Sequence, residues 1–446
     1  MHNPYLLGFR CTTCGADYSV EETRYTCTKD GGNLDAVYNY AAIAERVNPA
    51  DMVGVPDRSV WHYAFLLPLS YDSIAPVSAR SGPTPLSSLG WSPLYRAAAL
   101  ERGLDIRAIW LKDDGRLPSA SFKDRASSMV IARALDMGAE VVVTASTGNA
   151  AAALATMSVG TGIQAIVFVP EGTPEGKLAG ILIHGATVYA VPGSYDDAVA
   201  LCNAAAERFG WYNRSTGLNP YTREGKKTAA YEICEQLARM GKGEGGMGRG
   251  EWGRGTAQTI PFPISHSPSF RSPDVVIVPV GDGNIISGVH KGFKDLLALG
   301  WIERMPRFIG VTASLAPALF QAWQSGTEHI TRMPSSTLAS GISVDLPNDG
   351  IMALRAIRET GGTFIEATDE EMLDAMAVLG RDAGVFVEPA CAATYVGLVK
   401  ARRAGAIGPD DEVVLQLTGS GLKDTQSALR AAGKPRIVRS LDEISA

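Results

Sequence analysis

The sequence lacks the long apolar run that a membrane-spanning helix needs. No uninterrupted apolar stretch reaches the ~18–20 residues that cross a bilayer, and the start, MHNPYLLGFRCTTCG, has no basic segment followed by an apolar one. An excess of positive charge is also missing, because the 446 residues carry a formal net charge of −6. These absences argue against a membrane protein, a secreted precursor and a nucleic-acid-coating protein. We expect a cytoplasmic protein that binds neither membrane nor nucleic acid.

Cysteine is scarce and unevenly distributed. The six cysteines of this long chain argue against a disulfide framework. Cys11, Cys14 and Cys27 form a C-x2-C-x12-C pattern near the start, and Asp30 stands where a four-thiolate zinc ribbon would have its last ligand. We therefore predict a zinc-ribbon-like knob over residues 1–45 that holds no metal, with the three cysteines as weak candidate ligands.

Val- and Ile-rich runs alternate with helical patterns from about residue 106 onward. Such runs are typical of parallel strands buried on both faces, and they predict an α/β architecture. Ligands of such folds bind where the strands end, so the segments that follow the strands are the expected site. The predicted strands are 106–111, 140–145, 163–170, 187–192, 274–280, 307–313 and 412–417, and the predicted helices include 121–138, 194–210 and 369–384.

Four polar or Gly-rich segments follow predicted strands. Segment 146–149 (STGN) begins a helix and offers free amides to a carboxylate or phosphate, and segment 281–284 (GDGN) forms a nest that can cradle a phosphate. Thr418 stands at the tip of the last strand. Lys123 lies at the start of a helix in PSASFKDRASS (118–128). It is either a solvent-exposed residue behind a serine cap or a desolvated amine able to form a Schiff base.

The chain offers an amine, a phosphate nest, a carboxylate site and a strand-end hydroxyl. Pyridoxal 5′-phosphate needs a lysine for its aldehyde, a cradle for its phosphate and a partner for its ring nitrogen. The ordered motifs PSASFKDR, STGN, VPVGDGN, EPACAAT and LTGSGLKD resemble the threonine synthase branch of the fold-type-II pyridoxal-phosphate enzymes, the tryptophan synthase β-like group. The resemblance covers most of the chain. It implies two α/β domains with parallel or mixed sheets in a catalytic region over 46–446, behind the N-terminal cysteine-containing knob. It also implies a small mobile subdomain at about 138–215 and a homodimer.

One stretch of the catalytic region breaks the alternation of strands and helices. Segment 240–272 is Gly-rich and then Pro- and Ser-rich, without an apolar period. It is typical of a long surface loop, and we predict an insertion there.

The resemblance implies a role for each motif position. Lys123 is the catalytic Schiff-base lysine, Asn149 bonds the phenolic oxygen of the cofactor ring, and Thr418 faces the ring nitrogen. A neutral hydroxyl at that nitrogen suits elimination and replacement better than transamination. The other implied positions are the phosphate cradle, Gly281, Asp282, Gly283 and Asn284, and the binding site of the substrate carboxylate, Ser146 and Thr147.

Two segments depart from the family pattern. The family usually has Asn-Pro-Thr-Gly before Ser-Phe-Lys, where this chain has residues 117–120, Leu-Pro-Ser-Ala. In NPYTREGKKT (219–228), Thr222 occupies the family's arginine position. Because a substrate phosphate needs charge-assisted donors, we predict that Arg223 binds it, since a guanidinium can form two parallel bonds. Lys226 and its neighbour Lys227 are the alternatives, and all three charges could instead solvate the start of a surface helix.

The predicted activity is that of a lyase that converts O-phosphohomoserine and water to threonine and phosphate, so the predicted partner is a small amino-acid substrate. A cysteate synthase-like replacement on O-phosphoserine with sulfite is the closest alternative. The two substrates differ by one methylene, which a pocket discriminates by only ~1–3 kcal/mol. A serine/threonine dehydratase and a non-catalytic homologue that binds pyridoxal phosphate are the remaining alternatives.

Overall fold

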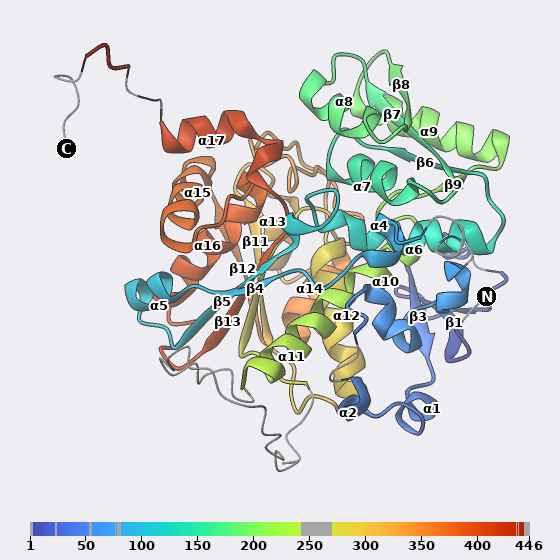
Figure 1. Ribbon diagram of the computed structural model, residues 1–446, viewed down its shortest axis with the longest axis horizontal. Helices are drawn as coiled ribbons and strands as arrows, with labels where there is room; N and C mark the ends of the chain where they lie inside the picture. The colour runs from blue at the N-terminus through green and yellow to red at the C-terminus, as the bar shows by residue number, and fades with distance from the viewer. Residues whose placement is uncertain are drawn as a thin grey trace, which may run out of the picture.

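The computed structural model shows three β-sheets joined by helices (Figure 1). Most of the predicted insertion at 240–272 lies outside the described residues. Within the described part of the chain, no helix is long and apolar enough to span a membrane. The structure describes residues 3–22, 25–52, 56–75, 77, 82–241, 270–433, 435 and 437–440.

The largest sheet has six strands in the order β12-β11-β10-β13-β5-β4, with β4 antiparallel to β5 and the other neighbours parallel. Its inner strands consist almost entirely of buried residues, as expected for a sheet covered on both faces. The strands are β4 (Leu94–Arg96), β5 (Ala108–Asp113), β10 (Val275–Pro279), β11 (Arg307–Ala313), β12 (Thr363–Ala367) and β13 (Glu412–Leu417).

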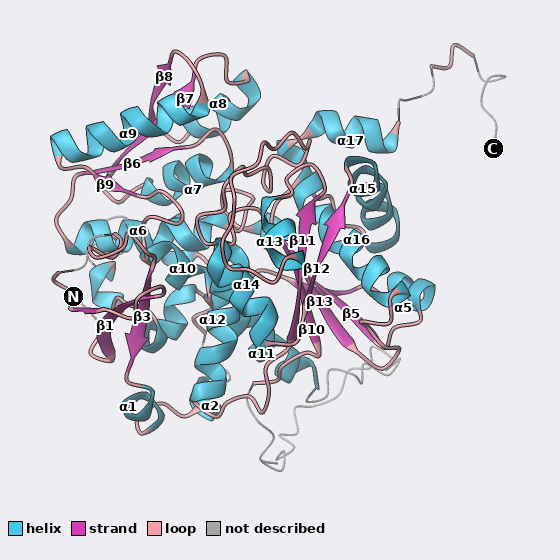
Figure 2. Ribbon diagram, turned by 180° about the vertical axis from the view of Figure 1, so that it is seen from behind, coloured by secondary structure: helices cyan, strands magenta, loops and turns pink. Residues whose placement is uncertain are grey.

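Helices cover both faces of this sheet (Figure 2). One face carries α12 (Asn284–Ala298) and α14 (Gly350–Glu359), which pack into the same apolar core as the knob. The opposite face carries α5 (Ala98–Leu104), α15 (Asp369–Ala383) and α16 (Pro389–Arg403), which form a second core. The remaining helices near the sheet are α10 (Tyr221–Lys226), α11 (Thr228–Gly241), α13 (Ala318–Gln324) and α17 (Thr425–Ala432).

A second, four-stranded parallel sheet in the order β8-β7-β6-β9 forms a separate layer (Figure 1). It has its own apolar core, which includes Val143, Phe168 and Cys202. Helix α6 (Lys123–Asp136) packs on α7 and α10 and so connects this layer to the rest. The elements are β6 (Val141–Ala145), α7 (Asn149–Ser158), β7 (Gln164–Pro170), α8 (Glu175–Leu182), β8 (Thr187–Val191), α9 (Tyr195–Phe209) and β9 (Tyr212–Asn213).

The knob is a three-stranded antiparallel sheet in the order β2-β1-β3. Phe9 of the knob lies 5.5 Å from Tyr221 of α10, measured between ring centroids, so its core is continuous with the main one. Its strands are β1 (Leu6–Cys11), β2 (Asp17–Tyr18) and β3 (Leu34–Tyr38), followed by α1 (Tyr40–Ala44), α2 (Pro49–Met52), η1 (Val60–Leu66), η2 (Tyr71–Ser73) and α4 (Pro85–Ser88).

All seven predicted strands are confirmed as β5, β6, β7, β8, β10, β11 and β13, and the three predicted helices as α6, α9 and α15. Strands β4, β9 and β12 were not predicted. The first two are only 3 and 2 residues long, and Glu366 interrupts the apolar run of the third. Their pairing is decided by neighbouring strands and not by their own sequence.

Candidate active site

Lys123 is the first residue of α6, which follows β5 and the short helix η3 (Asp114–Arg116). The helix has no side-chain cap, because the residue before it is Phe122 and Ser119 and Ser121 bond each other at 3.2 Å. The serine-cap interpretation is therefore wrong. Burial lowers the pKa of Lys123 to about 8, and repulsion from Arg214 adds to this effect. No hydrogen-bond acceptor or carboxylate contacts its Nζ among the described residues, so its amine is available for chemistry.

Thr418 and Lys123 are brought together by backbone pairing. The N–H of Phe122 donates to the carbonyl of Thr418 at 2.9 Å, and Ser420 donates to Ala120 at 3.1 Å. Thr418 itself is buried. The carboxyl end of β13 therefore lies beside the residues that precede Lys123. Ligands of parallel α/β folds bind at such strand ends.

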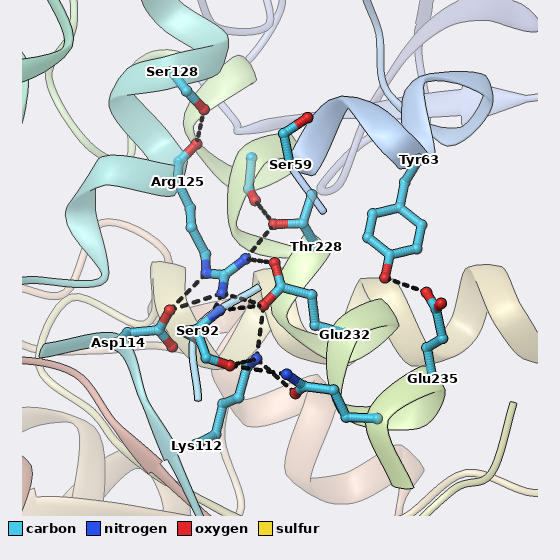
Figure 3. Close-up of polar contacts among 12 residues, drawn as sticks. Ser59, Tyr63, Ser92, Lys112, Asp114, Arg125, Ser128, Thr228, Glu232 and Glu235 are labelled. Atoms are coloured by element: carbon cyan, nitrogen blue, oxygen red, sulfur yellow. Dashed lines mark hydrogen bonds and ion pairs between the residues drawn. The ribbon is translucent and has the colours of Figure 1, made fainter. Parts of the chain in front are cut away.

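A buried ion-pair network anchors the beginning of α6 (Figure 3). Arg125, two residues after Lys123, pairs with Asp114 at 2.8 Å and with Glu232 of α11 at 2.6 Å. Lys112 of β5 pairs with the same Glu232 at 2.7 Å. All four side chains are at most 1% exposed, so the network fixes the helix between the sheet and α11.

Segment 146–149 lies between β6 and α7. The Ser146 hydroxyl accepts a bond from the Gly148 amide at 3.2 Å, and Ser146 and Thr147 remain partly exposed. Asn149 donates to both oxygens of Glu388, at 3.0 and 3.2 Å. Glu388 precedes α16, and its backbone amide donates to the Gly419 carbonyl at 3.2 Å. The structure thus joins Asn149 to the Thr418 loop through a carboxylate that had been given no site role.

Residues 281–284, the predicted phosphate cradle, lead from β10 into α12. Gly283 has a left-handed φ of 89° and no side chain caps α12. A Cβ added to Gly281 would lie 2.7 Å from the Ile342 Cα, so the backbone approach permits only glycine there. One oxygen of Asp282 accepts the Asn348 backbone amide at 2.8 Å, so it bonds a neighbouring loop. Burial raises the pKa of Asp282 to about 6.

Two further cations lie near residues 281–284. Lys226 bonds the side chain of Asn284, which also bonds Asp349. Arg214 follows β9 and is fully buried, with its Nε on Ser127 at 3.2 Å and its Nη1 on Thr216 at 2.6 Å. Within the part of the chain that the structure describes, its Nη2 has no hydrogen-bond partner.

Three basic residues of the site have lowered pKa values and no ion-pair partner among the described residues. We call them the site cations: Lys123, Arg214 and Lys226. Arg214 lowers the pKa of Lys123, and both lower the pKa of Lys226, although burial is the largest cause in each case. Burial also lowers the pKa of Arg214 to about 10. Among the described residues, none of the three forms an ion pair with a carboxylate. Sequence reasoning missed Arg214, because it follows a two-residue strand that gives no periodic signal.

Arg223, the predicted ligand of the substrate phosphate, and Lys227, the second alternative, lie in other surroundings than Lys226. Arg223 is 2% exposed, and its guanidinium donates to the Leu34 carbonyl of the knob at 2.7 Å, with Asp35 at 3.7 Å. Lys227 is fully buried and pairs with Glu224 at 2.7 Å and Asp295 at 2.9 Å. Both side chains are buried, so the interpretation that these charges lie on the exposed start of a surface helix is wrong. A role for Arg223 in binding substrate stays a prediction.

Comparison with known proteins identifies the family. Pyridoxal-phosphate dependent enzymes match residues 86–260 and 254–419 as a family. Threonine synthase from Methanosarcina acetivorans is 35% identical over 433 residues, covering 96% of this chain and 95% of that protein. Threonine synthase from Methanocaldococcus jannaschii is 36% identical over 428 residues, with coverage of 96% and 95%. The chain belongs to the threonine synthase branch of the pyridoxal-phosphate dependent enzymes.

Solved structures of pyridoxal-phosphate dependent enzymes share the fold. The processed form of threonine deaminase isoform 2 from Solanum lycopersicum has a TM-score of 0.62 at 19% identity, covering 81% of this chain and 87% of that one. Maize serine racemase has a TM-score of 0.59 at 20% identity, covering 81% and 96%. The predicted fold class is confirmed.

The side chains of the site fit the cofactor of this family. A half-buried amine with a lowered pKa is suited to an aldehyde, and the uncapped start of α12 is suited to a phosphate. The Arg214 Nη2, buried without a partner among the described residues, is a donor that an anion would satisfy. Together these groups can hold pyridoxal 5′-phosphate and leave a cationic region beside it.

Proposed function

We propose that this enzyme is a threonine synthase, which converts O-phosphohomoserine and water to threonine and phosphate. The observation that carries the proposal is the group of site cations. Arg214 and Lys226 are buried, Lys123 is half-buried, and none of them pairs with a carboxylate among the described residues. Burying a charge without compensation is costly, so a site that does so is built for an anionic ligand. The names of the relatives support the same reaction.

Two phosphate groups must be neutralised in this reaction, one on the cofactor and one on the substrate. The cradle offers backbone amides and the α12 N-terminus to the first, as other helix N-termini do for phosphates. Arg214 and Lys226 remain for the second, and the guanidinium can form charge-assisted bonds with two oxygens. Arg223, which lies against the knob, then has a structural role.

Lys123 is the residue that moves protons. When bound, pyridoxal 5′-phosphate supplies an electron sink for the negative charge formed at the substrate α-carbon. With a pKa of about 8, the Lys123 amine is neutral in an appreciable fraction near neutral pH, so it can accept the α-proton and return protons to the carbon chain. The net change breaks the Cγ–O bond, adds the hydroxyl of water at Cβ and leaves Cγ as a methyl group.

The remaining positions orient the two molecules. Ser146, Thr147 and the amides at the start of α7 would bind the substrate carboxylate, and Asn149 would turn from Glu388 to the phenolic oxygen of the cofactor ring. Thr418 would face the ring nitrogen. Closure of the four-stranded unit at about 138–215 over the substrate, a homodimer and a cytoplasmic location stay predictions.

The experiment measures phosphate release from O-phosphohomoserine and O-phosphoserine, each with and without sulfite. Wild type should release phosphate from O-phosphohomoserine and form threonine. Arg214→Ala should lower kcat/KM by about 10²-fold, since it removes a charge-assisted donor to the leaving group. Arg223→Ala is the matched control, because it removes the neighbouring buried guanidinium that contacts the knob.

Each alternative gives a different result. Phosphate release from O-phosphoserine that depends on sulfite would replace the proposal with a cysteate synthase-like replacement. Ammonia release from serine or threonine, without phosphate release from either phosphoamino acid, would replace it with a dehydratase. A larger loss in Arg223→Ala than in Arg214→Ala would return the substrate phosphate to Arg223.

A further inference from the structure

The knob contains two copies of one turn. Cys11-Thr-Thr-Cys14-Gly15 and Cys27-Thr-Lys-Asp30-Gly31 have the same spacing, with the second cysteine replaced by aspartate. In each turn the glycine amide donates to the carbonyl of the first cysteine, at 3.1 and 2.9 Å. The two glycines have left-handed φ values of 74° and 72°.

Both turns also direct backbone amides at their first sulfur. The amides of Thr13 and Cys14 donate to the Cys11 Sγ at 3.4 Å, and the amide of Lys29 donates to the Cys27 Sγ at 3.4 Å. The Tyr18 hydroxyl lies 3.0 Å from the Cys27 Sγ. Donors of this kind stabilise sulfur in its anionic form, which is the form that binds a metal.

The two turns face each other, so their four side chains converge. One ligand atom from each of Cys11, Cys14, Cys27 and Asp30 lies within 4.8 Å of all the others. The Cys14 and Cys27 sulfurs are 3.6 Å apart, and the Cys11 sulfur is 3.4 Å from the nearer Asp30 oxygen. A tetrahedral zinc ion with Zn–S bonds of about 2.3 Å would separate its sulfur ligands by about 3.8 Å.

Competing explanations of this cluster are weaker. The three cysteines are free, and a sulfur separation of 3.6 Å is far from the about 2.05 Å of a disulfide. Cys11 and Cys27 belong to the apolar core that the knob shares with the catalytic region, but packing alone does not explain why the Asp30 carboxylate lies 3.4 Å from the Cys11 sulfur. Two of the ligands, Cys11 and Cys27, are 2% and 3% exposed, whereas Cys14 and Asp30 are exposed and leave a path for the ion.

We propose that Cys11, Cys14, Cys27 and Asp30 form a structural zinc site, against the metal-free knob expected from the sequence. Three thiolates favour zinc over magnesium or calcium, which prefer oxygen ligands. The Asp30 carboxylate completes the tetrahedron, and the Gly32 amide orients it through a bond to its Oδ1 at 2.8 Å. Four protein ligands leave no open position, as in other structural sites.

This zinc site would support the active site through the residues that follow it. Asn33 donates to the Asp349 carboxylate at 2.7 Å, and Asp349 bonds Asn284 of the phosphate cradle. Thr12 of the first turn accepts from Arg355 of α14 at 2.5 Å. Zinc would therefore join a turn that contacts α14 to the turn before Asn33, and so hold the residue before β3 against Asp349.

The test is metal analysis of the full chain, purified without chelators from zinc-supplemented culture. We expect one zinc ion per chain in wild type and in the control Cys202→Ala, which removes a cysteine of the α9 core. Cys14→Ser and Asp30→Ala, both at exposed positions, should lose most of the zinc, whereas Asp30→Cys should keep it. Cobalt in place of zinc should give a strong thiolate-to-metal absorption band in wild type.

A second measurement needs no variant. Removing the metal from wild type with a chelator should speed hydrogen exchange in β1 and β3 and leave exchange in β10 unchanged. Only the knob loses the ion that holds its two turns together. Wild type with no more zinc than Cys14→Ser, or without the cobalt band, would overturn the proposal. Full zinc content in Asp30→Ala would overturn the assignment of the fourth ligand.

Discussion

Lys112 and Arg125 share the carboxylate of Glu232, whereas Lys123, Arg214 and Lys226 have no carboxylate partner among the described residues. Both groups lie in the same fold, and all of these side chains are buried except that of Lys123, which is half-buried. In the first, attraction within the protein offsets the cost of desolvation, so the charges fix the position of α6. In the second group, no carboxylate offsets the cost of desolvation, so we expect an anionic ligand to offset it. The comparison separates cations that hold the structure from cations that we propose bind substrate and cofactor.

The largest effect on activity is expected from removing the amine of Lys123. Lys123→Ala should lower the rate of threonine formation by at least ~10⁴-fold, because it removes the proton-transferring group. The free energy of unfolding should stay unchanged or rise, since an uncompensated charge is lost. Turnover and urea denaturation measure the two quantities, and near-normal turnover would contradict the role of Lys123.

Removing the counter-charge of the paired cations should lower the stability of the protein. Glu232→Gln leaves Lys112 and Arg125 short of a counter-charge and should lower the free energy of unfolding by about 3–5 kcal/mol. The exposed Glu207→Gln is the control and should change it by less than about 0.5 kcal/mol. Equal stability of the two variants in urea would show that the network does not anchor α6.

Removing one site cation should stabilise the protein at the expense of activity. Lys226→Met keeps the length of the side chain and removes its charge, and it should raise the free energy of unfolding of the cofactor-free protein by about 1–2 kcal/mol. Inorganic phosphate should stabilise wild type more than this variant. A less stable variant would mean that the Lys226 charge is compensated.

The pKa of Lys123 predicts how cofactor uptake depends on pH. A neutral amine is needed to attach to the aldehyde, so uptake by cofactor-free protein should rise with pH and level off above about 8, well below the usual lysine value of 10.5. Arg214→Met should move this midpoint upward, because the Arg214 charge helps to lower the pKa. Absorbance stopped-flow at several pH values measures it. An unchanged midpoint would contradict the proximity of the two cations.

The smallest effect concerns the turn that precedes Lys123. Ala120 has a left-handed φ of 57°, and it stands where the family usually has glycine. Ala120→Gly should therefore raise the free energy of unfolding by up to about 1 kcal/mol by relieving this strain. Ala126→Gly, inside α6, is the matched control and should lower it by about 1 kcal/mol. A loss in both would show that the turn is unstrained.

Much of the fold and part of the site could be predicted from local pattern. Buried parallel strands are continuous apolar runs, so β6, β7, β10, β11 and β13 are visible in the sequence. The motifs at 146–149, 281–284 and Thr418 could be found because ligands of parallel folds bind at strand ends. Strands β4, β9 and β12 could not, because their pairing depends on neighbours that are distant in sequence.

The sequence by itself determined the α/β class, the family and the position of Lys123 at a helix start, since each depends on residue order along a short segment. Only the tertiary structure decided which cations are compensated. Arg223 and Lys226 are three residues apart, yet one meets the knob and the other meets Asn284. It likewise brought Asp30 to three cysteines. Whether a buried charge has a partner, and whether four ligands converge, depends on distances between residues that are far apart in the sequence. Residue order alone does not give these distances.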